Sequence, residues 1–133
     1  MGDSLIKRVL ITGGAGFIGS NIALQLIYKG YHVTVLDNLS EQIHGKNPEM
    51  TSPLYKSIKG KVNFIHGSVT SRKDWLKALD GQDAVIHLAA ETGTGQSMYQ
   101  INQYNETNIM GTSNLLQAIS LAGKNSRVKK IIL

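Results

Sequence analysis

Three glycines near the amino terminus stand three residues apart and could together receive a diphosphate group. Gly13, Gly16 and Gly19 follow a short apolar run and precede a helical pattern. The first glycine lets the chain turn sharply, the second has no Cβ to keep a phosphate away, and the third allows close packing of the helix. A helix starting here points free N–H groups and about half a positive charge at the phosphates.

An acidic residue follows at the position that a dinucleotide requires. Asp37 lies 18 residues after Gly19, at the end of a second apolar run. A carboxylate there accepts hydrogen bonds from the hydroxyls of the adenosine ribose and repels a 2′-phosphate. The glycines and the acid together therefore predict binding of NAD rather than NADP. The alternative is a glycine-rich structural turn followed by an unrelated surface aspartate.

The hydrophobic pattern predicts strands that alternate with helices. Several strands are short apolar runs without polar alternation, which is typical of a parallel sheet covered on both faces. Right-handed crossovers would give a Rossmann-type doubly wound sheet of order 3-2-1-4-5, ending inside its fifth strand. Residues 38–61 hold both prolines and are expected to be irregular. Strands are expected at 9–12, 32–37, 62–65, 84–88 and 128–133, and helices at 17–28, 71–79 and 103–122. The buried candidates of the last helix are Ile109, Leu115, Leu116, Ile119 and Leu121.

Composition indicates one soluble globular domain over residues 1–133, with 41% hydrophobic and 17% charged residues. The chain has no cysteine, which excludes disulfides, thiolate metal sites and a cysteine nucleophile and suits a cytoplasmic location. The longest apolar runs are shorter than the about 20 residues that span a bilayer. The net charge of +5 is dispersed, which disfavours a nucleic-acid surface. The amino terminus has no signal-peptide pattern.

Other residues that could do chemistry have simpler interpretations. The four histidines (at 32, 44, 66 and 87) show no metal-ligand spacing, and His87 is expected in the core, as is Trp75. Glu91 could act as an acid or a base by its position, but we expect a plain loop residue, because nothing in the sequence gives it a charge partner. Asp83 is expected only to make a turn. Thr94 and Ser97 could contact a substrate or cap a local helix, and the sequence favours neither interpretation over the other.

Four segments of the chain resemble the extended short-chain dehydrogenase/reductase family, which contains NAD-dependent nucleotide-sugar epimerases and dehydratases. The glycine-rich loop, the Asp37 segment, the end of the fourth strand and the long helix carry the resemblance. Residues 37–45 and 91–99 look most like the dTDP-rhamnose 4-epimerase branch, near the UDP-glucose 4-epimerases. The four segments are residues 9–21, 36–40, 87–90 and 108–118.

The resemblance assigns cofactor contacts along these segments. It implies that backbone N–H groups of Phe17 and Ile18 hold the pyrophosphate and that Asp37, with its neighbours, holds the ribose. The family usually has aspartate where this chain has Ser68, so its contact with the adenine would lack a charge. The remaining implied contacts are Asn38 and Leu39 beside the ribose, Val69 at the adenine, Leu88, Ala89, Ala90 and Thr92 along the nicotinamide half, and Asn108 beneath it.

The resemblance also implies catalytic residues that this chain lacks. Family chemistry needs a serine or threonine and a Tyr-x-x-x-Lys pair, in which the tyrosine takes a proton from a sugar hydroxyl. Only Tyr55 and Lys59 have that spacing, and they precede the third strand, where the pair does not belong. We therefore expect the catalytic residues and the substrate-binding part beyond Leu133. The chain would be an amino-terminal portion, inactive alone.

Two functional classes and an assembly follow as expectations. The first class is the NAD-binding part of an epimerase or dehydratase that acts on a nucleotide-linked sugar. The second is a stand-alone dinucleotide-binding module or partner subunit without catalysis. In either class, the open edge of the fifth strand or the helix 103–122 is expected to form a homodimer contact.

Overall fold

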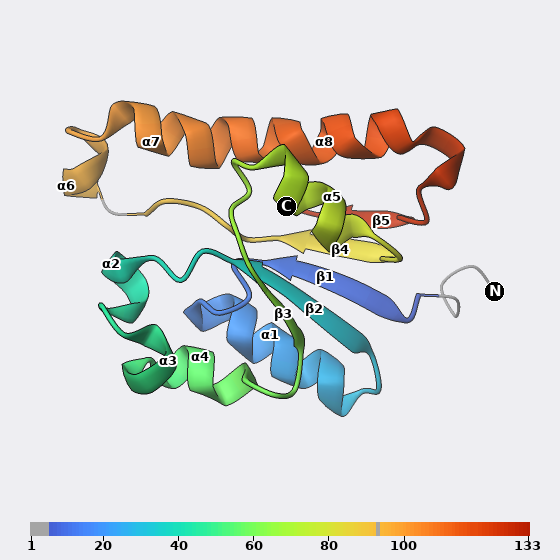
Figure 1. Cartoon of the computed structure of the whole chain (residues 1–133), viewed down its shortest axis with the longest axis horizontal. Helices are drawn as coiled ribbons and strands as arrows, with labels where there is room; N and C mark the ends of the chain where they lie inside the picture. Colours follow the sequence, from blue (N-terminus) through green and yellow to red (C-terminus); the bar gives the residue numbers. More distant parts are fainter. Residues whose placement is uncertain (1–5, 93) are drawn as a thin grey trace.

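A parallel sheet forms the middle layer of the protein (Figure 1). The computed structural model describes residues 6–92 and 94–133, and in this range the strands are ordered β3-β2-β1-β4-β5. This confirms the predicted α/β fold and strand order, and each strand lies within about two residues of its predicted bounds. The strands are β1 (Arg8–Thr12), β2 (His32–Asp37), β3 (Asn63–His66), β4 (Ala84–His87) and β5 (Lys130–Ile132).

Helices cover both faces of the sheet (Figure 1). On one face α1 (Phe17–Tyr28) packs beside α4 (Pro53–Ile58), and on the other α5 (Arg72–Leu79) packs beside α8 (Gly111–Ala122). The side chain of Ser71 accepts a hydrogen bond from the backbone N–H of Asp74, which confirms the predicted start of α5. The shorter segments are α2 (Glu41–His44), α3 (Pro48–Thr51), α6 (Thr94–Ser97), α7 (Ile101–Asn105), η2 (Glu106–Met110) and η3 (Gly123–Asn125).

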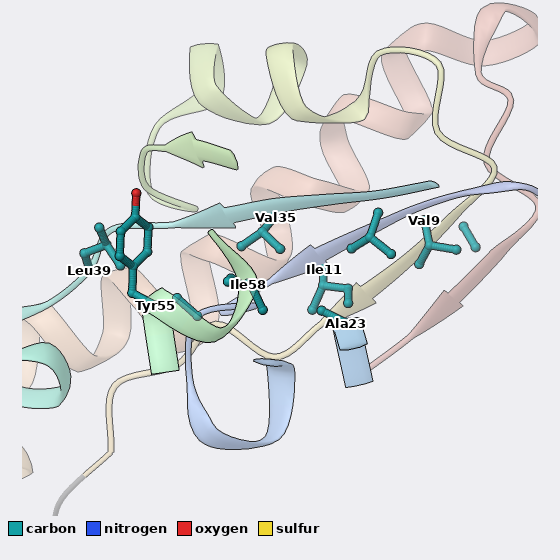
Figure 2. Close-up of a cluster of buried hydrophobic side chains, with 10 residues drawn as sticks. Val9, Ile11, Ala23, Val35, Leu39, Tyr55 and Ile58 are labelled. Carbon is teal, nitrogen blue, oxygen red and sulfur yellow. The ribbon is translucent and has the colours of Figure 1, made fainter. Parts of the chain in front are cut away.

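Successive residues of the central strand enter two separate cores. Val9 and Ile11 face α1 and α4, in the cluster that Figure 2 shows, whereas Leu10 faces α5 and α8. Trp75 lies fully buried in the second core, and its indole N–H donates to the carbonyl of Val69 at 2.7 Å. The apolar runs in the sequence thus reflect burial on both faces of the sheet.

The long helix over the sheet buries fewer residues than its sequence suggests. It begins at Ile101, passes through the π-helical turn η2 and continues as α8. Leu115 is fully buried, but Ile109, Leu116 and Leu121, which the pattern places among the buried candidates, are 60%, 52% and 59% exposed. The prediction is wrong for these three because a helix on the outside of a sheet buries only one stripe.

Residues 38–61 are not irregular, which corrects the sequence-based expectation. They form α2, α3 and α4, each four to six residues long. Segments this short carry too few positions to show a helical period. Both prolines stand in the first turn of a helix, where a missing N–H costs no hydrogen bond.

Asp83 does more than make a turn. It is buried, and its Oδ2 accepts hydrogen bonds from the backbone N–H groups of Lys7 at 2.9 Å and Arg8 at 3.0 Å. Its own N–H donates to the carbonyl of Arg8, and its carbonyl accepts from Lys129. The N–H of Lys7 is the main cause of a lowered pKa of the Asp83 carboxyl. Asp83 therefore ties together the starts of β1 and β4 and the segment before β5.

Candidate functional site

The glycine-rich loop makes two close approaches that exclude side chains. At Gly13 φ is +70°, and a Cβ there would lie 2.9 Å from the backbone nitrogen of Ala89. A Cβ at Gly19 would overlap the carbonyl oxygen of Gly13, so α1 packs against the loop itself rather than against β1. Both glycines thus hold the loop tightly between β1, α1 and the segment after β4.

Gly16 differs because its missing side chain leaves space. A Cβ there would meet only the carbonyl oxygen of Gly13, at 3.2 Å. Gly16 is also the N-cap of α1 and supplies no side-chain hydrogen bond to the first turn. The first N–H groups of a helix have no intrahelical acceptor. A diphosphate could approach this backbone closely and accept hydrogen bonds from those N–H groups. The loop therefore fits the pyrophosphate of a dinucleotide.

The carboxylate of Asp37 lies at the end of β2 and already holds the backbone on both sides. Its Oδ2 accepts from the N–H of Ala15 at 3.0 Å, and its Oδ1 accepts from the N–H of Leu39 at 2.8 Å. Each carboxylate oxygen has a second lone pair and can still accept from a ribose hydroxyl. Asp37 is 7% exposed, so a ligand in the adjoining cavity can reach it.

One cavity of about 410 Å³ brings the predicted segments together. Its volume lies in the range of small-molecule and cofactor sites. Residues from the glycine-rich loop, the end of β2, the end of β3 and the end of β4 line it, so segments far apart in the sequence converge. The predicted contacts among the lining residues are Gly13, Gly16, Phe17, Ile18, Gly19, Asp37, Asn38, Ser68, Val69, Leu88, Ala89, Ala90 and Thr92.

Three predicted contacts, Leu39, Asn108 and Ser97, do not line this cavity. Leu39 is buried in the core beside Tyr55 (Figure 2), with φ of +51°. The amide of Asn108 instead holds the backbone of Glu91, accepting from its N–H at 2.7 Å and donating to its carbonyl at 3.1 Å. Ser97 lies in α6, outside the lining residues. The side chain of Thr94 is outside the described part of the chain.

Several lining residues are ones that the sequence did not single out as contacts. Most come from the segment after Asp37, whose short helices the sequence pattern does not reveal. Glu91 was interpreted as a loop residue, and it lies at the cavity wall beside Ala90 and Thr92. The sequence signal for most of the others is proximity to a predicted contact, Asp37 for residues 36 and 40–44, Ser68 for Gly67 and Asn108 for Thr107. The added lining residues are Leu36, Ser40, Gln42, Ile43, His44, Leu54, Gly67, Glu91 and Thr107.

His87 is a satisfied core residue, as predicted. Thr12 Oγ1 accepts from the N–H groups of Leu88 and Ala89, so its own hydrogen is left for His87 Nδ1, at 2.6 Å. The Nε2–H then donates to Thr112 Oγ1 at 3.1 Å. Burial away from water lowers the pKa of His87. These contacts hold a neutral imidazole between β1, β4 and α8.

Residues 6–92 and 94–133 hold neither a metal site nor a membrane-spanning helix. No cluster of three or more histidine, aspartate or glutamate side chains there could hold a metal ion. The helices found in these ranges are all too short or too polar to cross a membrane.

Comparison with known proteins identifies the family. The model of the NAD dependent epimerase/dehydratase family matches residues 9–132. A UDP-glucose 4-epimerase of Yersinia enterocolitica is 37% identical over 127 residues, which are 93% of this chain and 35% of that protein. A dTDP-L-rhamnose 4-epimerase of Burkholderia thailandensis is 37% identical over 115 residues, which are 85% of this chain and 30% of that protein.

Solved structures agree with this result. The UDP-glucose 4-epimerase of Thermus thermophilus in complex with NAD has a TM-score of 0.74 and 31% identity, covering 93% of this chain and 36% of its own. The Thermotoga maritima enzyme with UDP-glucose has a TM-score of 0.75 and 32% identity, with the same coverage. The chain therefore spans about a third of the length of these four relatives, corresponding to their amino-terminal third. By its sequence and its fold, this chain is a member of the NAD dependent epimerase/dehydratase family.

Proposed function

We propose that residues 1–133 belong to a single dinucleotide-binding domain, and that this domain binds NAD in the cavity between the glycine-rich loop and the end of β4. The observation that carries the proposal is the convergence of Gly16, the start of α1 and Asp37 on one cavity. In this proposal, the N–H groups of Phe17 and Ile18 hold the pyrophosphate, and Asp37 holds the adenosine ribose. Asn38 and Leu39 support the ribose side through their backbone.

The other contacts follow the walls of the cavity. Ser68 and Val69 lie at the end of β3 and would flank the adenine, while residues 88–90 and Thr92 would line the nicotinamide half. The hydroxyl of Ser68 is hydrogen-bonded to Thr70 Oγ1 at 2.7 Å. Asn108 would act indirectly, by fixing the backbone of Glu91 at the cavity wall.

We further propose that the chain is the cofactor-binding part of an enzyme acting on a nucleotide-linked sugar. Bound NAD would supply the hydride-transfer chemistry at a sugar carbon. The residues of this chain bind and orient, but the described lining residues include no tyrosine and no lysine to move the proton. Tyr55, which has Lys59 four residues on, is buried in the core and does not line the cavity. Thr94 and Ser97 remain proposed contacts of the substrate.

Calorimetric titration with NAD tests the binding proposal. The wild-type chain should bind, and Gly16→Val should abolish binding because its side chain fills the space above the loop. Gln25→Val, on the exposed side of α1, is the matched control and should bind like the wild type. Asp37→Ala should weaken NAD binding by about 1–3 kcal/mol through loss of a charged acceptor and should reduce discrimination against NADP.

Three results would contradict the proposal or the expectation of inactivity. A wild-type chain that melts cooperatively but releases no heat with NAD does not bind it. Equal affinities of the wild type and Gly16→Val would place the cofactor elsewhere. Turnover of UDP-glucose or a dTDP-sugar by the 133-residue chain would contradict the expectation from the sequence that this part alone is inactive.

A further inference from the structure

His44 is a buried imidazole on the wall of the proposed cofactor cavity, outside the set of contacts proposed for NAD. It ends α2 and is 6% exposed, and it lines the cavity together with Asn38, Ser40 and Gln42. α2 begins four residues after Asp37, so this wall adjoins the end of β2. His44 therefore lies on the side of the cavity where Asp37 would hold the adenosine ribose.

The ring of His44 is held through one nitrogen only. Its Nδ1 lies 2.8 Å from Ser52 Oγ, and this hydroxyl also accepts from the N–H of Tyr55 at 3.3 Å as the N-cap of α4. Ser52 is buried, and α4 is packed on α1. The position of the ring is thus determined by a helix that belongs to the core.

The other nitrogen is left for a ligand. Within the described residues, Nε2 of His44 has no hydrogen-bond partner. Nε2 is not fully enclosed by the protein, so it keeps some accessible surface. Ser52 Oγ can donate to Nδ1 or accept from it, so Nε2 of a neutral ring is a donor in one case and an acceptor in the other. A hydroxyl group satisfies Nε2 in both cases, because it can both donate and accept.

We propose that His44 is a further cofactor-contact residue, whose Nε2 forms a hydrogen bond with a hydroxyl of the adenosine ribose that Asp37 would also hold. This inference rests on the proposed binding of NAD. Ser52 acts through His44, as its positioning residue. The pair makes the segment 38–61 part of the cofactor site rather than a mere connection between β2 and β3.

Titration of His44→Phe with NAD is the first test. Phenylalanine keeps an aromatic ring but removes both nitrogens, Nδ1 that contacts Ser52 and Nε2 that would contact the ribose. Affinity should fall by about 3- to 10-fold, the loss expected for one neutral hydrogen bond to the ligand. His44→Gln offers an amide that can donate or accept and should recover part of the loss. His32→Phe, an exposed histidine at the opposite end of β2, is the control and should bind like the wild type.

Two NAD analogues, lacking the 2′- or the 3′-hydroxyl of the adenosine ribose, identify the contacted group. For one of them, wild type and His44→Phe should bind equally. A penalty that persists with both analogues, or a His44→Phe chain with wild-type affinity for NAD, overturns the inference while leaving NAD binding intact. A wild-type chain that does not bind NAD instead rejects the proposed function.

A measurement on the wild-type chain covers the case in which His44→Phe fails to fold. In protein labelled with nitrogen-15 histidine, NAD should shift the Nε2 resonance of His44. The analogue without the contacted hydroxyl should bind without that shift. An Nε2 resonance that stays unchanged when NAD saturates the chain also overturns the inference.

Discussion

The Asp37 carboxylate organises the cofactor cavity as well as facing it. It joins the N–H of Ala15 in the glycine-rich loop to the N–H of Leu39 after β2. Leu39 has a left-handed backbone and a buried side chain, so this bond stabilises a conformation that a leucine rarely adopts. Loss of affinity in Asp37→Ala therefore has two sources, the missing ribose contact and a less ordered loop. Thermal melting of the same variant separates them.

The His87 imidazole should make the stability of the protein depend on pH. Its pKa is lowered in the folded state, so the unfolded chain binds more protons over the range between the folded and the unperturbed pKa. The contribution of neutral His87 to stability is thus present above about pH 6.5 and is lost as the pH falls. We expect the free energy of unfolding to decrease from about pH 7.5 to about pH 5.5, measured by urea denaturation.

Substitution separates His87 from the other histidines. His87→Gln should be less stable overall, because the contacts with Thr12 and Thr112 change, but should show a weaker pH dependence. His32→Gln, which removes an exposed histidine at the start of β2, should keep the wild-type slope. An unchanged slope in His87→Gln would mean that another group causes the dependence.

Single residues with a local task could be recognised from the sequence, whereas those defined by a distant partner could not. Gly13, Gly16 and Asp37 each serve the turn or strand end on which they stand. The bond between His44 and Ser52, and that between Asn108 and Glu91, depend on how separate segments meet. No periodicity or spacing in the chain indicates those meetings.

The same distinction applies to helices and strands. The sheet order follows from alternating strands and helices and the right-handed crossover rule, so it was predictable. The exposure of Ile109 and Leu116 was not, because it depends on which stripe of the long helix meets α5 and the sheet. The short helices α2 to α4 escaped detection because none completes two turns.

The hydrogen bonds by which Asp83 joins the starts of β1 and β4 should contribute to the stability of the sheet. Asp83→Ala would leave the N–H groups of Lys7 and Arg8 without their acceptor, and we expect a loss of about 1–3 kcal/mol in the free energy of unfolding. Asp83→Asn should retain much of the stability, since an amide oxygen can also accept both bonds. The partner Arg127 is exposed, so the ion pair at 3.5 Å contributes little.

Chemical denaturation checks this prediction. Asp80→Ala is the control, because Asp80 is an exposed residue just after α5 and its loss should change stability little. If Asp83→Ala and Asp80→Ala unfolded at the same denaturant concentration, the bonds to Lys7 and Arg8 would not matter for stability.

Apolar surface on the outside of the molecule predicts association of the chain with itself. Ile109, Leu116 and Leu121 are exposed on the long helix, and β5 has a hydrogen-bonded neighbour on one side only. Exposed apolar stripes and open strand edges favour contacts between molecules. We expect the 133-residue chain to elute from size-exclusion chromatography as a dimer or larger species, with mass measured by light scattering.

Charge substitutions distinguish the two surfaces. The double variant Ile109→Lys and Leu116→Lys should become monomeric if the long helix is the contact, and Ile132→Lys should do so if the edge of β5 is. Gln117→Lys on α8 is a control for added charge. A wild-type chain that is monomeric at all concentrations and melts sharply would contradict the prediction.

The central position of β1 has a consequence for synthesis of the protein on the ribosome. β1 is made first, but Val9 pairs with Val33, 24 residues later, and with Ala84, 75 residues later. Until β4 has left the exit tunnel, one edge of this apolar strand has no partner. During much of its translation the nascent chain thus exposes an apolar, aggregation-prone strand, the kind of segment that chaperones bind.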